Sequence, residues 1–296
     1  MKKTWIKGLL GITSILVLAA CGAEGTGDSG SDVASSDATS STDVDTSADT
    51  TTDGDKLAAI KEKGVLTIAT TADYPPYEWH LVKDGQDTIV GFDIDIAQAI
   101  ADEFGVKLVV KDMDFNGLIP SLSTGKVDLI LAGMNPTAER AESVDFTDIY
   151  ITTQDVVLIR KEDEDKYKSQ ADLADADWAT QKSTIQEEYL LENFPDSDIQ
   201  SVGKWGTAIL SLKTGRVDGI LMVETVAKQY AKENDDLVIA DLELDSTPNE
   251  SAIAVQKGNE EFLETVNGIL NALQEDGTVE ELILKNTQLM EENTIE

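Results

Sequence analysis

The chain has 296 residues, 41% of them hydrophobic, which is enough to bury two modest cores. Its 57 acidic and 23 basic residues give a net charge of −34, which argues against nucleic-acid binding, because Lys and Arg supply most phosphate contacts. One cysteine and one histidine exclude an internal disulfide and a zinc site of several imidazoles. We expect no metal, cofactor or catalytic residue, and we expect His80 on an exposed loop rather than acting as a protease base.

The first twenty residues are typical of a signal peptide, which we predict over 1–20. Lysines at positions 2, 3 and 7 precede the apolar segment Gly8–Ala20, which is well short of the roughly 20 residues a membrane span needs. Small residues before Cys21 resemble the lipobox of bacterial lipoproteins, which implies cleavage before Cys21 and a lipid on its sulfur. An ordinary signal peptide that happens to contain cysteine is the alternative.

Residues 21–55 are predicted to be the lipidated cysteine followed by a disordered acidic tether. After Cys21 the segment is rich in Ser, Thr, Asp, Gly and Ala and contains no Lys or Arg, so it has almost nothing to bury. As a flexible coil it would span about 30–35 Å. The lipid would hold the protein on the outer face of the cytoplasmic membrane, and the long hydrophilic tether suggests a Gram-positive host.

From Lys56 onward the pattern becomes that of a folded α/β protein. The elements expected in chain order are a helix over 57–64, the strand Val65–Thr70, a strand end and amphipathic helix within 89–106, a strand over 107–113, a helix over 115–125 and a strand over 127–133. Strands alternating with helices predict a parallel sheet covered by helices.

One phrase occurs twice, as SLSTGKVDLILAG at Ser121–Gly133 and as SLKTGRVDGILMV at Ser211–Val223. Each copy predicts a helix that stops at a left-handed glycine, Gly125 or Gly215, followed by a strand. The buried stripes expected on the two helices are Leu118, Ile119 and Leu122, and Ile209, Leu210 and Leu212. The repeat therefore predicts two similar α/β lobes with a ligand between them at the strand ends. The alternative is that the repeat has no functional meaning, because α/β proteins reuse such units freely.

A candidate anion site follows the first copy. Asn135 is expected to cap a helix, and Arg140 then lies near that helix start, where a guanidinium and free N–H groups suit a carboxylate. A surface arginine paired with Glu139 or Glu142 is the alternative.

The second lobe offers a counterpart to this anion site. Thr184 and Glu187 fit a capping box, so the hydroxyls of Ser183 and Thr184 face the same anion; a capping box alone explains the pattern equally well. Tyr74 and Tyr77 on a Pro-Pro loop, with Phe115 after a strand, suit a sandwich around a small side chain.

These motifs together resemble the amino-acid-binding proteins of polar amino-acid ABC importers, solute-binding protein family 3. The resemblance covers roughly residues 56–286, through GFDIDIAQAIA, ADYPPYEW, FNGLIPSLSTGKVDLILAGM, TAERAESVDFT, QKSTIQE and GRVDGILMVETVAKQY. It implies a two-lobed type II periplasmic-binding-protein fold of α/β class with two hinge segments. Lobe 1 would comprise 56–153 and 250–290, and lobe 2 would comprise 154–249.

The resemblance also implies residue roles. Arg140 would grip the α-carboxylate of a free L-amino acid, and Ser183 and Thr184 would close on it from lobe 2. The full ligand-binding set is Tyr74, Tyr77, Glu78, Phe115, Gly133, Met134, Asn135, Arg140, Ser183, Thr184 and Glu224. Two positions depart from the family pattern: Ser183 stands where Gly is usual, and Val223 stands where an acid usually pairs the α-ammonium. Either Glu224 or another carboxylate must then take that role.

The implied function is transport, not catalysis. The protein, expected to be a monomer, would close its lobes on the amino acid by hinges near 151–157 and 244–252 and dock on a membrane permease. Glu260–Asn286 would return to lobe 1. Asp73 and Glu78 favour a cationic ligand such as Arg, Lys or His, although Thr71 stands where basic-amino-acid binders often carry Asp. A polar ligand such as glutamine or cystine, or a lyase or dehydratase on the same fold, remains an alternative.

Overall fold

The computed structural model describes residues 55–293, and the predictions for the signal peptide, for Cys21 and for the tether up to residue 54 lie outside that range. Helix α1 (Asp55–Lys63) begins at the last residue of the predicted tether, so Asp55 belongs to the folded part. Among the described helices none is long and apolar enough to span a bilayer.

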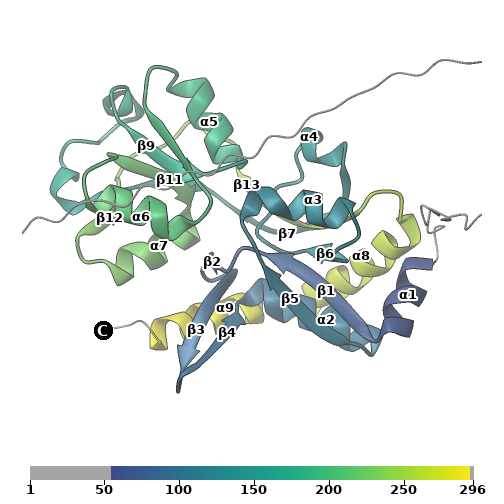
Figure 1. The fold of residues 1–296 in the computed structure, drawn as a ribbon. Helices are drawn as coiled ribbons and strands as arrows, with labels where there is room; N and C mark the ends of the chain where they lie inside the picture. The colour runs from purple at the N-terminus through teal and green to yellow at the C-terminus, as the bar shows by residue number, and fades with distance from the viewer. Residues whose placement is uncertain (1–54, 294–296) are drawn as a thin grey trace, which may run out of the picture. The chain divides into compact units, whose positions relative to one another are not determined.

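The first lobe is built on a five-stranded sheet of order β5-β1-β6-β13-β7 (Figure 1). Its strands are β1 (Val65–Thr70), β5 (Lys107–Asp112), β6 (Leu129–Ile130), β7 (Val144–Thr153) and β13 (Asn249–Gln256). β5, β1 and β6 are parallel, whereas β13 is antiparallel to both neighbours. The parallel arrangement predicted for the strands over 65–70, 107–113 and 127–133 is therefore confirmed. No prediction covered β13, which re-enters the sheet from the other lobe in the opposite direction.

The second lobe repeats this plan in a sheet of order β10-β9-β11-β8-β12. Its strands are β8 (Asp155–Arg160), β9 (Trp178–Gln181), β10 (Ile199–Val202), β11 (Gly219–Val223) and β12 (Leu237–Ile239). β10, β9 and β11 are parallel, and β8 is antiparallel to β11 and β12. The fold is thus a two-lobed α/β fold in which each sheet has three parallel strands and an antiparallel pair.

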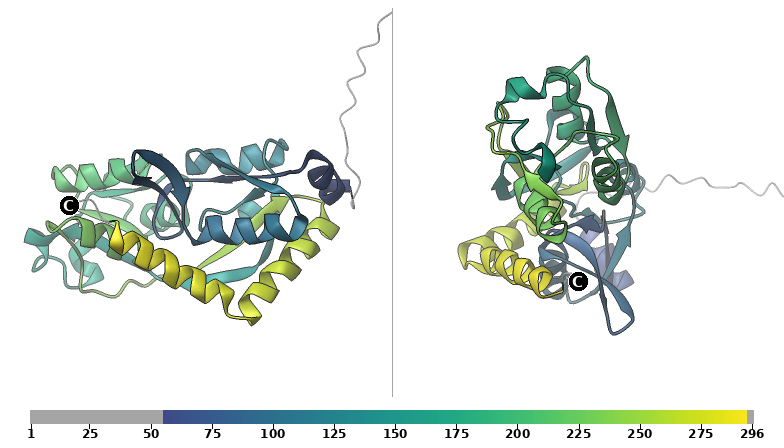
Figure 2. Two further views of the ribbon diagram at one scale, coloured as in Figure 1. Left: turned by 90° about the horizontal axis from the view of Figure 1, so that it is seen from below. Right: turned by 90° about the vertical axis from the view of Figure 1, so that its left-hand side faces the viewer.

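Amphipathic helices cover the sheets. In lobe 1, α2 (Phe92–Phe104) buries one apolar stripe and stops at Gly105, whose φ of 71° is the left-handed conformation predicted for it. α8 (Glu260–Glu275) and α9 (Thr278–Glu292) both pack against α2, and Figure 2 shows them as two yellow helices meeting at an angle. The lobe 2 helices are α5 (Ile185–Asn193), α6 (Trp205–Lys213) and α7 (Glu224–Glu233).

The repeated phrase folds as the same unit in both lobes. Helix α3 (Leu118–Ser123) leads to β6 and α6 leads to β11, and Gly125 and Gly215 follow the two helices with φ of 68° and 69°. The buried stripes are correct except at two positions. Ile119 is only partly buried, and Leu210 is 62% exposed because it points away from the sheet.

A hairpin interrupts the alternation in lobe 1. β3 (Glu78–Lys83) and β4 (Gln86–Val90) are antiparallel and joined by Asp84 and Gly85, both with positive φ, while β2 (Asp73–Tyr74) pairs with β3. His80 is therefore in a strand and not a loop as predicted, although its side chain is exposed and contacts Asp87.

The chain crosses between the sheets twice. It passes from β7 to β8 through Gln154, and from β12 to β13 over residues 240–248. The two crossings are neighbours, because Thr153 at the end of β7 pairs with Asn249 at the start of β13. Shorter elements complete the described chain: η1 (Phe115–Gly117), α4 (Ala138–Ala141), η2 (Lys161–Asp163) and η3 (Gln170–Leu173).

Candidate functional site

A pocket lies between the two lobes where the parallel strands end. Thr71 directly follows β1 and Gln181 is the last residue of β9, so the pocket is at the carboxyl edge of both sheets, as expected for this architecture. Its lining residues are Thr71, Tyr74, Glu78, Phe115, Ala132, Gly133 and Asn135 from lobe 1, and Gln181, Thr184, Gln186 and Trp205 from lobe 2.

Gly91 fixes the loop that carries Tyr74 and Glu78. The N–H groups at the start of α2 donate to the carbonyls of Pro76 and Tyr77, so the loop lies directly on the helix start. Gly91 has a φ of 142°, and a Cβ there would be 1.9 Å from the Tyr77 carbonyl oxygen. Only glycine allows this approach, which gives the first residue of GFDIDI a structural role.

Aromatic rings form one wall of the pocket. The Tyr74 ring stacks on Trp205 of the other lobe with centroids 5.9 Å apart, and the Tyr77 ring contacts Tyr74 at 5.0 Å. Tyr77 itself is fully buried behind Tyr74 and packs on Phe92, so it supports the wall without lining the pocket.

Glu78 places an unsatisfied carboxyl group in the pocket. Its side chain is fully buried, and no group within residues 55–293 hydrogen-bonds either oxygen. Burial raises the pKa of Glu78 well above its ordinary value, and the nearby charges of Asp93 and Asp73 add to the shift; Thr70 and Asp93 affect this pKa without reaching hydrogen-bond geometry. A buried acid with unused acceptors is a ready partner for a cation.

Asp93, the second residue of α2, lies behind the pocket. One of its oxygens accepts hydrogen bonds from the Gly133 N–H and the Tyr150 hydroxyl, each 3.0 Å long. Burial raises the pKa of Asp93 to about 7, although these two hydrogen bonds oppose the shift. The Gly133 N–H is thus occupied, so among its polar groups the Gly133 carbonyl remains for a ligand.

Arg140 joins the lobes at the edge of the pocket. Its Nη1 donates to the Asn135 carbonyl at 2.8 Å and its Nη2 donates to the Ser183 carbonyl of lobe 2 at 2.9 Å, while its guanidinium lies 5.2 Å from the centre of the Phe115 ring. Burial lowers the pKa of Arg140 to about 10, so the group is cationic at neutral pH. These bonds use two of its five N–H donors, which leaves capacity for an anion beside them.

The expected helix caps are partly confirmed. Thr137, not Asn135, caps α4, because the Asn135 amide instead donates to the Asn249 side chain and to the Glu250 carbonyl. Thr184 caps α5 as predicted, and its hydroxyl also donates to the Gln181 carbonyl. The Glu187 carboxylate accepts from the Ser183 N–H and not from Thr184, so the capping box is shifted by one residue.

Two predicted site residues lie away from the pocket. Met134 is fully buried in the core of lobe 1. Glu224 begins α7, is partly exposed and forms an ion pair with Lys228 at 2.7 Å. The remaining predicted residues, Tyr74, Tyr77, Glu78, Phe115, Gly133, Asn135, Arg140, Ser183 and Thr184, are brought together at the pocket or directly behind it.

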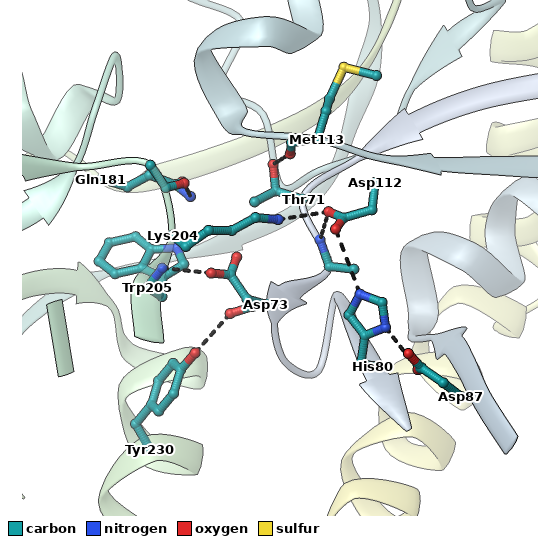
Figure 3. A network of polar contacts seen from close by, with 12 residues as sticks. Thr71, Asp73, His80, Asp87, Asp112, Met113, Gln181, Lys204, Trp205 and Tyr230 are labelled. Atoms are coloured by element: carbon teal, nitrogen blue, oxygen red, sulfur yellow. Dashed lines mark hydrogen bonds and ion pairs between the residues drawn. The ribbon is translucent and has the colours of Figure 1, made fainter. Parts of the chain in front are cut away.

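Sequence reasoning missed Trp205 and the contacts that hold it. Figure 3 shows Asp73 and Asp112 of lobe 1 beside Lys204 and Trp205 of lobe 2. The Asp73 carboxylate accepts the Trp205 N–H at 2.6 Å, and Lys204 forms an ion pair with Asp112 at 2.8 Å. Capping preferences point to an acceptor at this helix start, but no local pattern shows that it comes from the other lobe.

Paired lobes, a pocket at their strand ends and a guanidinium beside it define a two-lobed solute-binding protein. Residues 66–288 match the model of the bacterial extracellular solute-binding proteins, family 3, and the chain belongs to this family. The resemblance found in the sequence is therefore confirmed.

Named relatives include amino-acid-binding proteins. The chain is 36% identical over 225 residues to the arginine-binding extracellular protein ArtP of Bacillus subtilis, covering 74% of this chain and 85% of ArtP. The chain is also similar to a solved structure, the substrate-binding protein of an amino acid ABC transporter from Streptococcus pneumoniae bound to L-arginine. The TM-score is 0.76 and the sequence identity is 38%, and the similar region covers 79% of this chain and 98% of that chain.

An ancestral amino-acid-binding protein, described as a precursor of cyclohexadienyl dehydratase, is similar as well, with a TM-score of 0.71 and 36% identity. The similar region covers 77% of this chain and 98% of that chain. The family is thus one of extracellular solute-binding proteins, and the relatives named above are described as amino-acid-binding or substrate-binding proteins.

Proposed function

We propose that this protein captures a free L-amino acid with a cationic side chain, arginine above all, between its lobes and delivers it to the permease of an ABC importer. Arg140 takes the α-carboxylate with help from the first turn of α5, and Tyr74, Phe115 and Trp205 enclose the side chain. The proposal follows the arginine-binding relatives but is carried by one observation in this chain.

That observation is the Glu78 carboxyl group, fully buried in the pocket with neither oxygen hydrogen-bonded in the described part of the chain. A guanidinium donates two parallel hydrogen bonds to a carboxylate, which would satisfy both oxygens at once. A neutral side chain such as that of glutamine brings no cation to stabilise the ionised carboxylate, whose pKa is raised by burial, and therefore gains none of this charge pairing.

Calorimetric titration with each of the twenty amino acids, with cystine and with citrulline tests the proposal. We expect arginine to bind most tightly and citrulline, its neutral isostere, to bind at least 100-fold more weakly. Heat from glutamine or cystine alone would overturn the choice of a cation. Recovery of the titrated amino acid unchanged separates a binding protein from a dehydratase, since an enzyme would release product.

We further propose that Cys21 carries the lipid anchor and that 1–20 is removed. Mass spectrometry of membrane-extracted protein would show a diacylglyceryl-modified Cys21 at the new N-terminus, and Cys21→Ala would release the protein into the medium. Retention of the variant on the membrane would contradict this anchor. The monomeric state is checked by sedimentation of the mature chain.

A further inference from the structure

A bound amino acid brings an α-ammonium group as well as its carboxylate. Burying that ammonium without an anionic partner is costly, so the pocket needs a second carboxylate besides the one that meets the side chain. The strand end at Val223 does not supply one, because Val223 is apolar and buried, and Glu224 pairs with Lys228 outside the pocket.

The neighbouring strand supplies an acid at the same level. In the antiparallel β8–β11 ladder, Val223 pairs directly with Asp155. Residues directly opposite each other in such a ladder project their side chains from the same face of the sheet, with Cβ atoms about 5 Å apart. A carboxylate on Asp155 therefore reaches much of the space that a carboxylate at position 223 would reach.

Two hydrogen bonds tie Asp155 to residues around the pocket. Its Oδ1 accepts from Gln186, which lines the pocket, at 2.8 Å, and from Asn249 at 3.2 Å. Asn249 in turn accepts from the amide of Asn135, another lining residue, at 2.8 Å. Within residues 55–293 both bonds to Asp155 reach Oδ1, so Oδ2 keeps its capacity to accept.

The charge of Asp155 also acts on the pocket. Burial is the main cause of the raised pKa of Tyr74, and the charge of Asp155 adds to it. The pKa of Asp155 itself is raised by burial in spite of its bonds to Gln186 and Asn249, so a cation beside it would relieve an electrostatic cost. The other acids near the pocket have roles already described: Glu78 is proposed to meet the ligand side chain, Asp93 holds Gly133 and Tyr150, and Asp73 accepts the backbone N–H of Trp205.

We infer that Asp155 binds the α-ammonium group of the amino acid, acting from β8 in place of an acid at the end of β11. The inference rests on the proposed function, since it concerns the same ligand. It assigns the two charges of the pocket to the two ends of the ligand: Asp155 meets the α-ammonium and Glu78 meets the side-chain cation.

Two ligands that each lack one cation separate these roles. Asp155→Asn should weaken arginine binding about 30-fold, the effect of losing one buried charge partner, but should leave binding of 5-guanidinopentanoic acid, which lacks the α-amino group, within twofold of the wild type. Glu78→Gln should show the reverse selectivity: it weakens binding of both guanidinium ligands but leaves the weak binding of citrulline unchanged.

Placing the acid at position 223, opposite Asp155 in the ladder, should rescue binding in the Asp155 variant. Asp155→Asn combined with Val223→Asp should recover most of the arginine affinity, whereas a role of Asp155 in folding or hinge geometry would not be rescued. Asp196→Asn on the exposed surface of lobe 2 is the charge-matched control. Melting temperatures of all variants without added ligand establish that they fold.

The inference is overturned if Asp155→Asn binds arginine like the wild type, or loses the same factor for arginine and for the deaminated analogue. A loss of arginine binding in Glu224→Gln instead would assign the ammonium to Glu224. Wild-type protein that binds no amino acid at all would refute the proposed function itself, so the two failures are distinct.

Discussion

The carboxylate of Asp73 in lobe 1 accepts the backbone N–H of Trp205 in lobe 2 at 2.6 Å. Trp205 is the first residue of α6, whose own N-cap residue, Lys204, makes no side-chain capping bond. The cap of α6 is therefore supplied across the pocket, and beside it Lys204 forms its ion pair with Asp112 (Figure 3). The contact between the lobes thus supplies an acceptor at a helix start beside the pocket.

Removing this cap should weaken ligand binding without touching the ligand. Asp73→Ala removes an acceptor worth about 1 kcal/mol, so the Kd for arginine should rise about fivefold, mostly through faster dissociation measured by stopped flow.

Burial raises the pKa of Asp73 to about 6, against the opposing effects of Lys204 and the Trp205 N–H, so its charged form is disfavoured in this arrangement. Asp73→Asn, a neutral acceptor, should therefore bind at least as tightly as wild type at pH 7.5. Weaker binding by Asp73→Asn than by Asp73→Ala would contradict the capping role.

Arg140 should be indispensable for affinity. Arg140→Ala removes a buried cation and should weaken arginine binding about 100-fold, or about 3 kcal/mol, in calorimetry. Arg140→Lys should lose less, because it keeps the charge but not the planar fork. Arg216→Ala, an exposed arginine of lobe 2, is the matched control. Unchanged affinity for arginine in Arg140→Ala would show that Arg140 does not bind the α-carboxylate.

The buried acids should make stability depend on pH. The raised pKa values of Glu78 and of Asp93, about 7 for the latter, mean that between about pH 4 and pH 7 the folded chain holds protons that the unfolded chain has lost. The free energy of unfolding without added amino acid should therefore fall as the pH rises through this window. Glu78→Gln should show a shallower fall and exceed the wild type in stability at pH 8, measured by urea unfolding at several pH values. Wild-type stability that rises with pH here would contradict the burial of these charges.

Ser183 offers a gain in stability. It adopts a φ of 64°, in the left-handed region that disfavours residues with a Cβ. Ser183→Gly should raise the free energy of unfolding by about 1 kcal/mol, since the backbone bonds to Arg140 and Glu187 are kept. Ser183→Ala keeps the Cβ and should show no gain. Equal stability of the two variants would locate the effect in the lost hydroxyl instead.

Much of the fold was predictable because its signals are local. The glycine stops after α3 and α6, the amphipathic α2 and the Thr184 cap depend on residues a few positions apart. Leu210 was misplaced because both sides of α6 carry apolar residues and periodicity alone did not identify the buried one. The β3–β4 hairpin was missed although Asp84-Gly85 between two strands is a strong turn signal.

Several residues of the site were predictable from the sequence, but which of them contact one another was not. Arg140 and Glu78 follow from residue type and family pattern, whereas the Trp205 contact with Asp73 joins residues 132 positions apart. The partner of Val223 likewise depends on the register of β8 against β11, which a single sequence does not specify. Contacts between lobes arise only when both lobes and their connection are built.

The pairing of Thr153 with Asn249 has a mechanical consequence. This pairing joins the two crossings into a two-stranded ribbon. Bending such a ribbon out of its plane keeps the hydrogen bonds between its strands, whereas sliding one strand along the other would break them. A rotation of one lobe about this ribbon would break or form together the bonds that join the lobes, including those of Arg140 to Ser183 and of Trp205 to Asp73. On the proposed function, we expect ligand binding to change the outline of the protein in one concerted step, so that the loaded and unloaded forms present different surfaces.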